Sequence, residues 1–220
     1  MIPLRDVIPS RTTPYITVTI IALNALAWLF ELALPGDVLE PFLRVYGVVP
    51  GDFHPSTLIT SMFLHGSWMH VIGNMWYLWI FGDNVEDRLG HGRFIVFYLL
   101  CGMLAALGQI AIDPGSMLPT IGASGAIAGV MGAYFVLYPR SRVLTLISII
   151  IFWEVVELPA IVLLGFWFVM QLFSAGTIAI TAGTGGGGVA FAAHVAGFVA
   201  GMVVGLVFRK PQVNAWEADY

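Results

Sequence analysis

The sequence predicts an all-α polytopic membrane protein, because of its composition and the spacing of its apolar stretches. Of its 220 residues, 59% are hydrophobic and 10% are charged, and the mean hydropathy is +0.90. Soluble domains carry about 25% charged residues, so this composition excludes a globular domain with a single membrane anchor. The 25 glycines fit closely packed membrane helices, because small residues let helix backbones approach one another.

Six apolar stretches approach the roughly 20 residues that a membrane-spanning helix needs. They cover residues 15–34, 69–82, 93–112, 121–138, 159–180 and 189–208. A further apolar run at residues 143–153 is too short to span a membrane alone, and we interpret it as interfacial or re-entrant. The sequence therefore predicts six spans in a single membrane domain over residues 1–220.

The distribution of basic residues supports six spans and gives their orientation. With six spans, Arg44 lies on one side of the membrane, and the other side receives Arg5, Arg11, Arg88, Arg93, Arg140, Arg142, Arg209 and Lys210. Basic residues gather on the cytoplasmic side, so both termini are expected there as short tails at about residues 1–14 and 209–220. A seventh span would split the basic residues between the two sides.

Two loops on the expected outer side stand out. The loop between the first two spans, residues 35–68, is the longest, and its segments 41–46 and 56–64 are amphipathic enough for short interfacial helices. Long structured loops tend to be functional. The loop at residues 181–188 is almost entirely Gly and Thr, and we expect it to be flexible.

Charge and cysteine content exclude two further features. The net charge is −4 and basic residues occur at most in pairs, so nucleic-acid binding has no support. The single cysteine, Cys101, excludes an intramolecular disulfide.

Ser124 and His194 are the candidate catalytic pair. Ser124 lies among glycines at the start of the fourth span, and His194 lies in the sixth. An imidazole is costly in hydrocarbon and usually functional there, and Ser with His is the minimum for an activated oxygen nucleophile. Each lies 14 residues from the inner end of its span, which is about 21 Å at 1.5 Å per residue. The pair is therefore expected at one level, about 10 Å below the outer edge of a ~30 Å hydrocarbon slab.

His70, Asn74 and the backbone N–H of Ser124 are the candidate oxyanion donors. His70 and Asn74 are four residues apart and share one face of the second span. An imidazole and an amide near a nucleophilic serine can donate hydrogen bonds to a developing oxyanion.

Glycines are expected to bring the fourth and sixth spans together near this site. Gly197 and Gly201 lie four residues apart on the sixth span and would pack against Gly125 and the glycines that follow it on the fourth. The loop at residues 113–121 must then dip into the membrane to reach Ser124, and irregular backbone at that depth is tolerated where it lines a watery cavity.

Each of these features alone has a structural alternative. Gly-x-Ser-Gly is also a small-residue packing motif, and His70 with Asn74 could bond one helix to another. His194 could be a packing histidine or a proton-relay group. A small-solute or proton transporter that uses His70 and His194 as relay groups therefore stays open, although the sequence shows no internal repeat of the kind many transporters have.

Taken together, these motifs resemble the rhomboid family of intramembrane serine proteases. The matching segments run in order along nearly the whole chain: Ile2-Pro3-Leu4-Arg5-Asp6, His65 with His70 and Asn74, Gly122-Ala123-Ser124-Gly125, Gly165 to Phe173, and Ala193-His194-x-x-Gly197-x-x-x-Gly201. The resemblance implies a six-transmembrane-helix rhomboid-like bundle. It also implies a serine endopeptidase that cleaves transmembrane segments of other membrane proteins near their outer ends, with no metal and no cofactor.

Residue by residue, the resemblance implies a Ser–His dyad without a third acidic residue. Ser124 would be the nucleophile, and His194 would be the general base and then the acid for the leaving amine. His70, Asn74 and the Ser124 N–H would form the oxyanion hole.

Two positions depart from the family pattern. Many members have Trp-Arg in the outer loop where this chain has Ser56-Thr57, which leaves open how that loop is anchored. Many members also have an aromatic residue one turn after the serine, against which the histidine stacks, where this chain has Ala128. Which side chain packs against the His194 ring in this chain is therefore left open by the sequence.

The alternative within the same family is a catalytically silent rhomboid-like protein that binds and escorts membrane spans, and the complete Ser124–His194 pair argues against it. The expected partners are transmembrane protein substrates and the lipid bilayer. Substrates would enter laterally past the fifth span, whose entry at residues 153–159 is irregular. The compact six-span form favours a prokaryotic plasma membrane, with the active site opening to the outer side.

Overall fold

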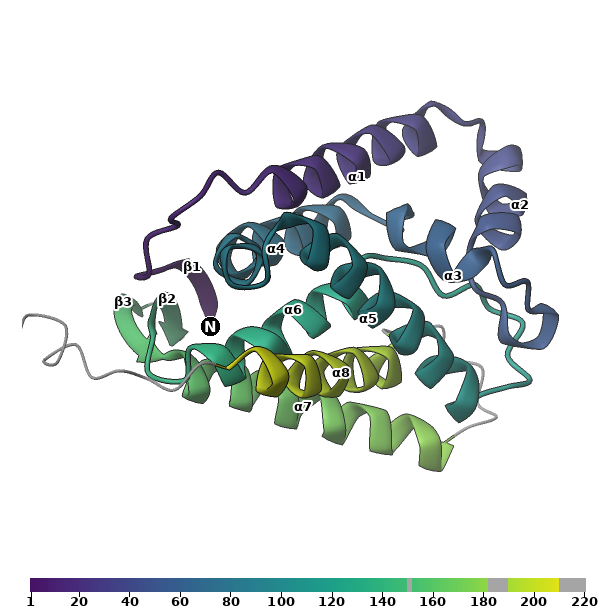
Figure 1. Cartoon of the computed structure of the whole chain (residues 1–220). Helices are drawn as coiled ribbons and strands as arrows, with labels where there is room; N and C mark the ends of the chain where they lie inside the picture. The colour runs from purple at the N-terminus through teal and green to yellow at the C-terminus, as the bar shows by residue number, and fades with distance from the viewer. Residues whose placement is uncertain (150–151, 182–189, 210–220) are drawn as a thin grey trace, which may run out of the picture.

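The computed structural model of the chain describes residues 1–149, 152–181 and 190–209 (Figure 1). Most of this part is helical, in α1 (Tyr15–Ala33), α2 (Gly36–Tyr46), η1 (Pro50–Asp52), α3 (Thr57–Thr60), η2 (Ser61–Phe63), α4 (Trp68–Leu89), α5 (His91–Ile112), α6 (Ser124–Leu137), α7 (Ala160–Thr181) and α8 (Phe191–Phe208). Three strands, β1 (Ile2–Asp6), β2 (Arg142–Ile149) and β3 (Phe152–Pro159), complete the described part. The predicted flexible loop at residues 181–188 lies, apart from Thr181, outside the described residues.

Three of the described helices, α1, α5 and α8, are long and apolar enough to cross a membrane. Two shorter apolar helical segments, Ser124–Leu137 in α6 and Ala160–Ser174 in α7, accompany them. The described helices are therefore of the kind that a lipid bilayer accommodates.

The central helix of the bundle is α6. Nearly all of its residues are buried, because α4, α5, α7 and α8 pack around it. Figure 1 shows α1 along one edge of the bundle, α7 along the opposite edge, and α6 between them. Burial on all sides explains why α6 is apolar around its whole circumference, without one polar face.

The backbones of α6 and α8 are in direct contact at glycines. A Cβ added at Gly197 would overlap the carbonyl oxygen of Gly125, and a Cβ added at Gly201 would overlap that of Gly129. Only glycine fits such a contact without moving a helix. This close approach holds the first turn of α8 beside the first turn of α6.

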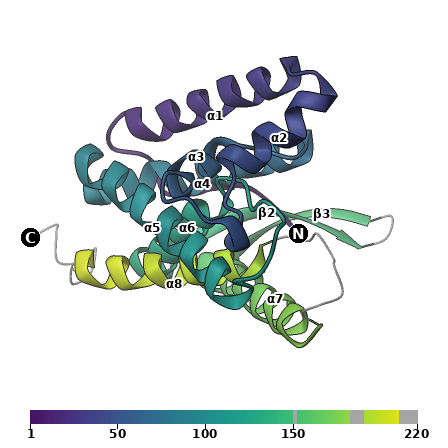
Figure 2. The ribbon, with the colours of Figure 1, turned by 90° about the vertical axis from the view of Figure 1, so that its right-hand side faces the viewer.

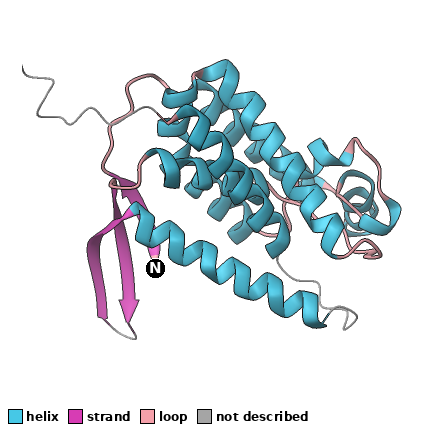
Figure 3. Cartoon of the chain, turned by 60° about the horizontal axis from the view of Figure 1, so that its bottom comes forward, coloured by secondary structure: helices cyan, strands magenta, loops and turns pink. Residues whose placement is uncertain are grey.

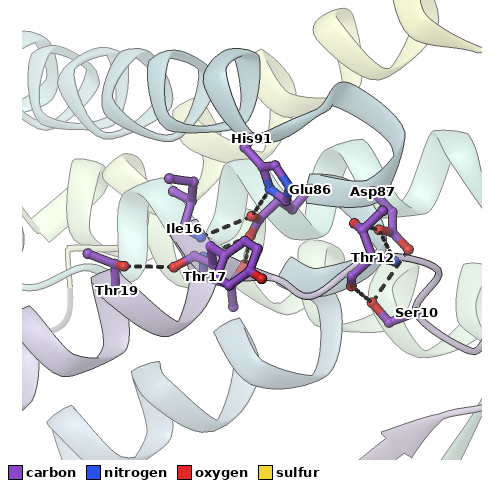
Figure 4. Close-up of polar contacts among 9 residues, drawn as sticks. Ser10, Thr12, Ile16, Thr17, Thr19, Glu86, Asp87 and His91 are labelled. Atoms are coloured by element: carbon purple, nitrogen blue, oxygen red, sulfur yellow. Dashed lines mark hydrogen bonds and ion pairs between the residues drawn. The ribbon is translucent and has the colours of Figure 1, made fainter.

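A buried carboxylate ties α1, α4 and α5 together at one end of the bundle (Figure 4). Glu86 of α4 accepts hydrogen bonds from the backbone N–H groups of Ile16 and Thr17 at 2.9 and 2.8 Å, and from the Thr17 hydroxyl at 2.7 Å. It also pairs with Nδ1 of His91, the first residue of α5, at 2.5 Å. A carboxylate at the start of α1 satisfies free N–H groups and complements the helix dipole.

A three-stranded antiparallel sheet, with strand order β1-β2-β3, departs from the all-α prediction. In β1, Ile2 pairs with Leu146 of β2, so part of the predicted tail at residues 1–14 is a strand. The run at residues 143–153 was predicted as interfacial or re-entrant. Where the structure describes it, apart from residues 150 and 151, it forms part of the β2–β3 hairpin, which Figure 2 shows extending beyond the helices. Pairing between segments about 140 residues apart leaves no periodic signal in either one, which is why the sequence did not predict it.

The segment between α1 and α4 positions the residues just before α6. It contains helices at both predicted amphipathic segments, α2 and the successive α3 and η2. Val48 and Thr120 exchange backbone hydrogen bonds at 3.0 and 2.8 Å, and the N–H of Gly122 donates to the carbonyl of Ser61 at 2.8 Å. These bonds fix the irregular backbone that leads into Ser124.

Candidate active site

Ser124 and His194 meet in the structure. Nε2 of His194 lies 2.8 Å from Oγ of Ser124, although 70 residues separate them in the chain. Ser124 is the first residue of α6, and His194 lies in the first turn of α8 with 8% of its surface exposed. The depth arithmetic, which placed the two at one level, agrees with this geometry.

The turn before Ser124 requires a glycine. Gly122 has a φ of +121°, a conformation that residues with a Cβ rarely adopt. A Cβ added there would also lie 2.6 Å from Nε2 of His70. The backbone two residues before the serine therefore lies directly against the His70 imidazole.

The two predicted oxyanion side chains of α4 face this turn. Nδ1 of His70 accepts a hydrogen bond from the N–H of Gly66 at 3.4 Å, which leaves Nε2 to carry the proton and to act as a donor toward Gly122. The Nδ2 atom of Asn74 lies 3.7 Å from the position of a Cβ on Gly122. Ser124, at the start of α6, adds a backbone N–H that has no partner within the helix.

His65 and Glu31, which were not predicted as site residues, support Asn74, the first directly and the second through His65. Nε2 of His65 lies 3.0 Å from Nδ2 of Asn74 and accepts its hydrogen bond. Burial, with His70 nearby, lowers the pKa of His65 to about 4, so that its ring is neutral and able to accept at pH 7. The N–H of His65 in turn donates to both carboxylate oxygens of Glu31, at 3.2 Å each. A carboxylate within an apolar span was the signal that could have found Glu31.

His194 has a further partner that the sequence reasoning missed. Nδ1 of His194 lies 2.7 Å from Oε1 of Gln171 on α7. The ring of Trp167, one turn earlier on α7, lies 5.7 Å from the His194 ring at an interplanar angle of 36°. Ala128 is fully buried and offers no aromatic face, so α7, and not α6, supplies the ring that covers the histidine. Gln171 is the only side-chain amide of α7, and this was the available signal.

The Ser56-Thr57 position begins α3. The hydroxyl of Thr57 donates to the carbonyl of His54 at 2.6 Å, and one turn later the hydroxyl of Thr60 donates to the carbonyl of Tyr46 at 2.6 Å. Thr57 is buried. Hydroxyl-to-backbone bonds therefore anchor the loop here, where many family members have Trp-Arg.

A small pocket opens beside Ser124. Its lining comes from α5, α6, α8, η2 and the loops beside them, and residues without bulky side chains dominate near the serine, among them Gly102, Ala105, Gly125 and Ala193.

The helical bundle, with a helix-initial serine against a buried histidine, fits the family that the sequence motifs resemble. The family model described as Rhomboid domain matches residues 52–211, and the chain belongs to the rhomboid family. It is therefore a multi-pass membrane protein.

Relatives from bacteria and mitochondria share parts of the chain. The protein named "Putative rhomboid protease YdcA" from Bacillus subtilis is 32% identical over 129 residues, which cover 56% of this chain and 62% of YdcA. Rhomboid protein 1, mitochondrial, from Saccharomyces cerevisiae is 31% identical over 109 residues, 47% of this chain and 32% of the yeast protein. Rhomboid protease GluP from Bacillus subtilis is 38% identical over 76 residues, 34% of this chain and 14% of GluP. The chain thus matches less than two thirds of the length of each relative.

Proposed function

We propose that this protein is an intramembrane serine endopeptidase that cleaves transmembrane segments of other membrane proteins. The observation that carries the proposal is the 2.8 Å contact between Nε2 of His194 and Oγ of Ser124 at the start of a central, buried helix. The names of the relatives YdcA and GluP, which both describe rhomboid proteases, support the same activity.

The proposed reaction is acyl transfer to serine followed by hydrolysis. Oγ of Ser124 attacks the scissile carbonyl carbon while Nε2 of His194 takes the hydroxyl proton. The C–N bond breaks, and the same proton passes from His194 to the leaving amine. Water then attacks the acyl-enzyme with His194 again as base, which releases the new carboxylate and regenerates Ser124.

The oxyanion of each tetrahedral intermediate would be held by three neutral donors. These are Nε2–H of His70, the side-chain amide of Asn74 and the backbone N–H of Ser124. Neutral donors suit a membrane site, because they stabilise the developing charge without burying a permanent one.

The chain is proposed to cross the membrane six times, with both termini on the side where the basic residues gather and the active site toward the other side. A prokaryotic plasma membrane fits this compact form. A substrate helix must unwind before its carbonyls can be attacked, which favours segments with Gly, Ala, Ser or Pro near the outer end. Cleavage after a small side chain is what the resemblance to rhomboid proteases implies, and the pocket beside Ser124 is a small one.

The test is cleavage of a transmembrane reporter by the purified full chain in liposomes. We expect wild-type protein to cut the reporter, and both Ser124→Ala and His194→Ala to abolish the cut. We expect a chelator to leave the rate unchanged, because the dyad mechanism uses no metal.

The outcomes separate the candidate functions. Cleavage that persists in either variant would contradict the dyad. Reporter binding without cleavage by the wild type would favour the silent escort protein over the protease.

A further inference from the structure

We infer that Gln171 is a positioning residue that fixes the orientation and tautomer of His194, and that the catalytic pair is complete only while α7 is packed against α8. This inference rests on the proposed function for its catalytic consequence. It adds a third member to the dyad, and it places that member on a different helix.

The hydrogen-bond geometry gives Gln171 a defined role. In the amide orientation of the structure, Oε1 faces Nδ1 of His194 at 2.7 Å and can only accept, which favours the tautomer with the proton on Nδ1. Nε2 is then unprotonated and able to accept the hydroxyl proton of Ser124 at 2.8 Å. The bond made by the far nitrogen of a histidine sets which nitrogen can act as base.

α7 contacts the His194 ring in two ways, through the Trp167 ring and through the hydrogen bond of Gln171 at the ring edge. Trp167 and Gln171 are four residues apart and share one face of α7, and on α8 His194 and Phe198 have the same spacing. Trp167 contacts both of these rings, at centroid distances of 5.7 Å from His194 and 5.9 Å from Phe198. Phe191 of α8 also meets the His194 ring edge-on at 6.3 Å. With Ala128 at the alternative stacking position, α7 adds the Trp167 ring and the hydrogen-bond partner of Nδ1.

The packing of α7 weakens along the helix toward Gln171. Leu163 and Leu164 near its start are buried, whereas Met170 is 46% and Phe173 is 70% exposed. Figure 3 shows α7 leaving the sheet and running along the periphery of the bundle. Residues 160, 163 and 164 are buried, whereas none of residues 165–174 is fully buried, so the described part of α7 that holds His194 has fewer buried contacts than its start. Segments with few buried contacts open at low free-energy cost.

A displacement of this half of α7 would break the bond from Gln171 before it disturbs the contact between α6 and α8. His194 would keep its place on α8 but lose the partner that sets its tautomer. The position of α7 is therefore coupled to the reactivity of Ser124 through one side chain.

The test compares Gln171→Met and Gln171→Glu with the wild type in the liposome cleavage assay. Methionine keeps the length of the side chain without a comparable acceptor, and we expect kcat to fall by about 10- to 100-fold, the range found for residues that orient metal-bound histidines, with KM nearly unchanged. Glutamate keeps the acceptor, as in Ser–His–Glu triads, and should recover most of the rate. The control is Met170→Leu, on the exposed side of α7, with an unchanged rate.

A double-mutant cycle tests the coupling to α7. Phe168 stacks on Phe198 at 4.6 Å, and Phe168→Ala should loosen α7 and lower kcat in the wild type. In the Gln171→Met background the same change should have little further effect, because the bond is already absent. If Phe168→Ala lowers kcat by the same factor in the wild type and in Gln171→Met, the two changes are independent and the coupling is overturned.

A spectroscopic readout keeps the inference separate from the protease activity. Nitrogen-15 NMR of labelled histidines, with His194 assigned from its absence in His194→Asn, should show Nδ1-protonated His194 in the wild type and a mixture of tautomers in Gln171→Met. If the wild type fails to cleave but shows this difference, the proposed function fails and the positioning role stands. An unchanged His194 signal and a kcat within twofold of wild type in Gln171→Met would overturn the inference.

Discussion

At the scale of residues, neutral polar groups make the direct contacts of the candidate site, and the Glu31 carboxylate lies one step further out, against the N–H of His65. His194, Ser124 and Gln171 form one chain of hydrogen bonds, and Asn74 with His65 forms another. Transfer from water to a low-dielectric surrounding costs less free energy for a hydrogen-bonded neutral pair than for ions. The arrangement would therefore orient the proposed nucleophile without the carboxylate that soluble serine proteases place beside their histidine.

Asn74→Ala tests the oxyanion assignment. Loss of one oxyanion donor should lower kcat by about 10²- to 10³-fold with little change in KM, measured with the transmembrane reporter. Asn24→Ala is the matched control, because Asn24 is an equally buried amide that donates to the Ile20 carbonyl within α1. An equal loss of kcat in both variants would show a general loss of structure and not the loss of an oxyanion donor.

Asp6 makes the stability of the strand contact depend on pH. It accepts hydrogen bonds from Nδ2 of Asn84 at 2.9 Å and from the hydroxyl of Tyr134 at 2.8 Å. Burial raises the pKa of Asp6 from 3.8 to about 6 in the folded protein, against the lowering effect of the bond from Tyr134. The folded state therefore binds this proton more tightly than the unfolded state does.

The contribution of Asp6 to stability should be present below pH 3.8 and be lost as the pH rises to about 6. We expect the melting temperature of the wild type in detergent micelles to fall, relative to that of Asp6→Asn, across this interval. The difference should then stay constant at higher pH. If the melting temperatures of the wild type and Asp6→Asn change in parallel with pH, the raised pKa of Asp6 is contradicted.

How much of the site could be predicted depends on the residue. Ser124 and His194 could be predicted because a histidine in an apolar span is unusual, and because the rise of a helix per residue gives the depth of each residue. Gln171 lay within a recognised segment, but apolar neighbours on all sides left no periodicity to show which face of α7 turns inward. Only the packed structure brings its amide to His194.

At the scale of elements, the contact between α6 and α8 sets the distance from serine to histidine. Gly201→Ala should destabilise the protein by about 1–3 kcal/mol, the usual cost of overpacking, because its Cβ would overlap the carbonyl of Gly129. The shift of α8 should also reduce cleavage. Gly73→Ala is the control, since nothing lies within 4 Å of a Cβ there.

The changes in the free energy of unfolding of the two Gly-to-Ala variants should therefore differ in sign. Alanine at residue 73 should leave stability unchanged or raise it by up to about 1 kcal/mol through helix propensity. Thermal unfolding in micelles provides the comparison. A Gly201→Ala protein as stable and active as the wild type would show that the two helices can separate without consequence.

The sheet is the element that the sequence reasoning described least well. The run at residues 143–153 was too short for a span, and its β-branched residues favour a strand. Its partner β1 lies at the other end of the chain, however, and a five-residue segment read alone is indistinguishable from a tail. The hairpin joins α6 to α7, so it connects the helix of the nucleophile to the helix of Gln171.

At the scale of the whole molecule, the proposed function accounts for helices that depart from ideal spans. α6 has 14 residues, as expected if the chain enters it at the proposed depth of Ser124 and not at a membrane surface. The last two turns of α4 are charged, and one of these charges, Glu86, is buried against the start of α1. Hydropathy alone therefore marks three of the described helices, and the six-span topology stays a prediction that charge distribution supports.

The most direct measurement is the reaction of the protein with a fluorophosphonate, which phosphonylates an activated serine and releases fluoride. Intact-mass analysis of the full chain in micelles should show one adduct, and peptide mapping should place it on Ser124. We expect the adduct to be absent from Ser124→Ala and strongly reduced in His194→Ala. An unlabelled wild-type protein, or an adduct on another residue, would contradict the claim that Ser124 and His194 form a working nucleophile.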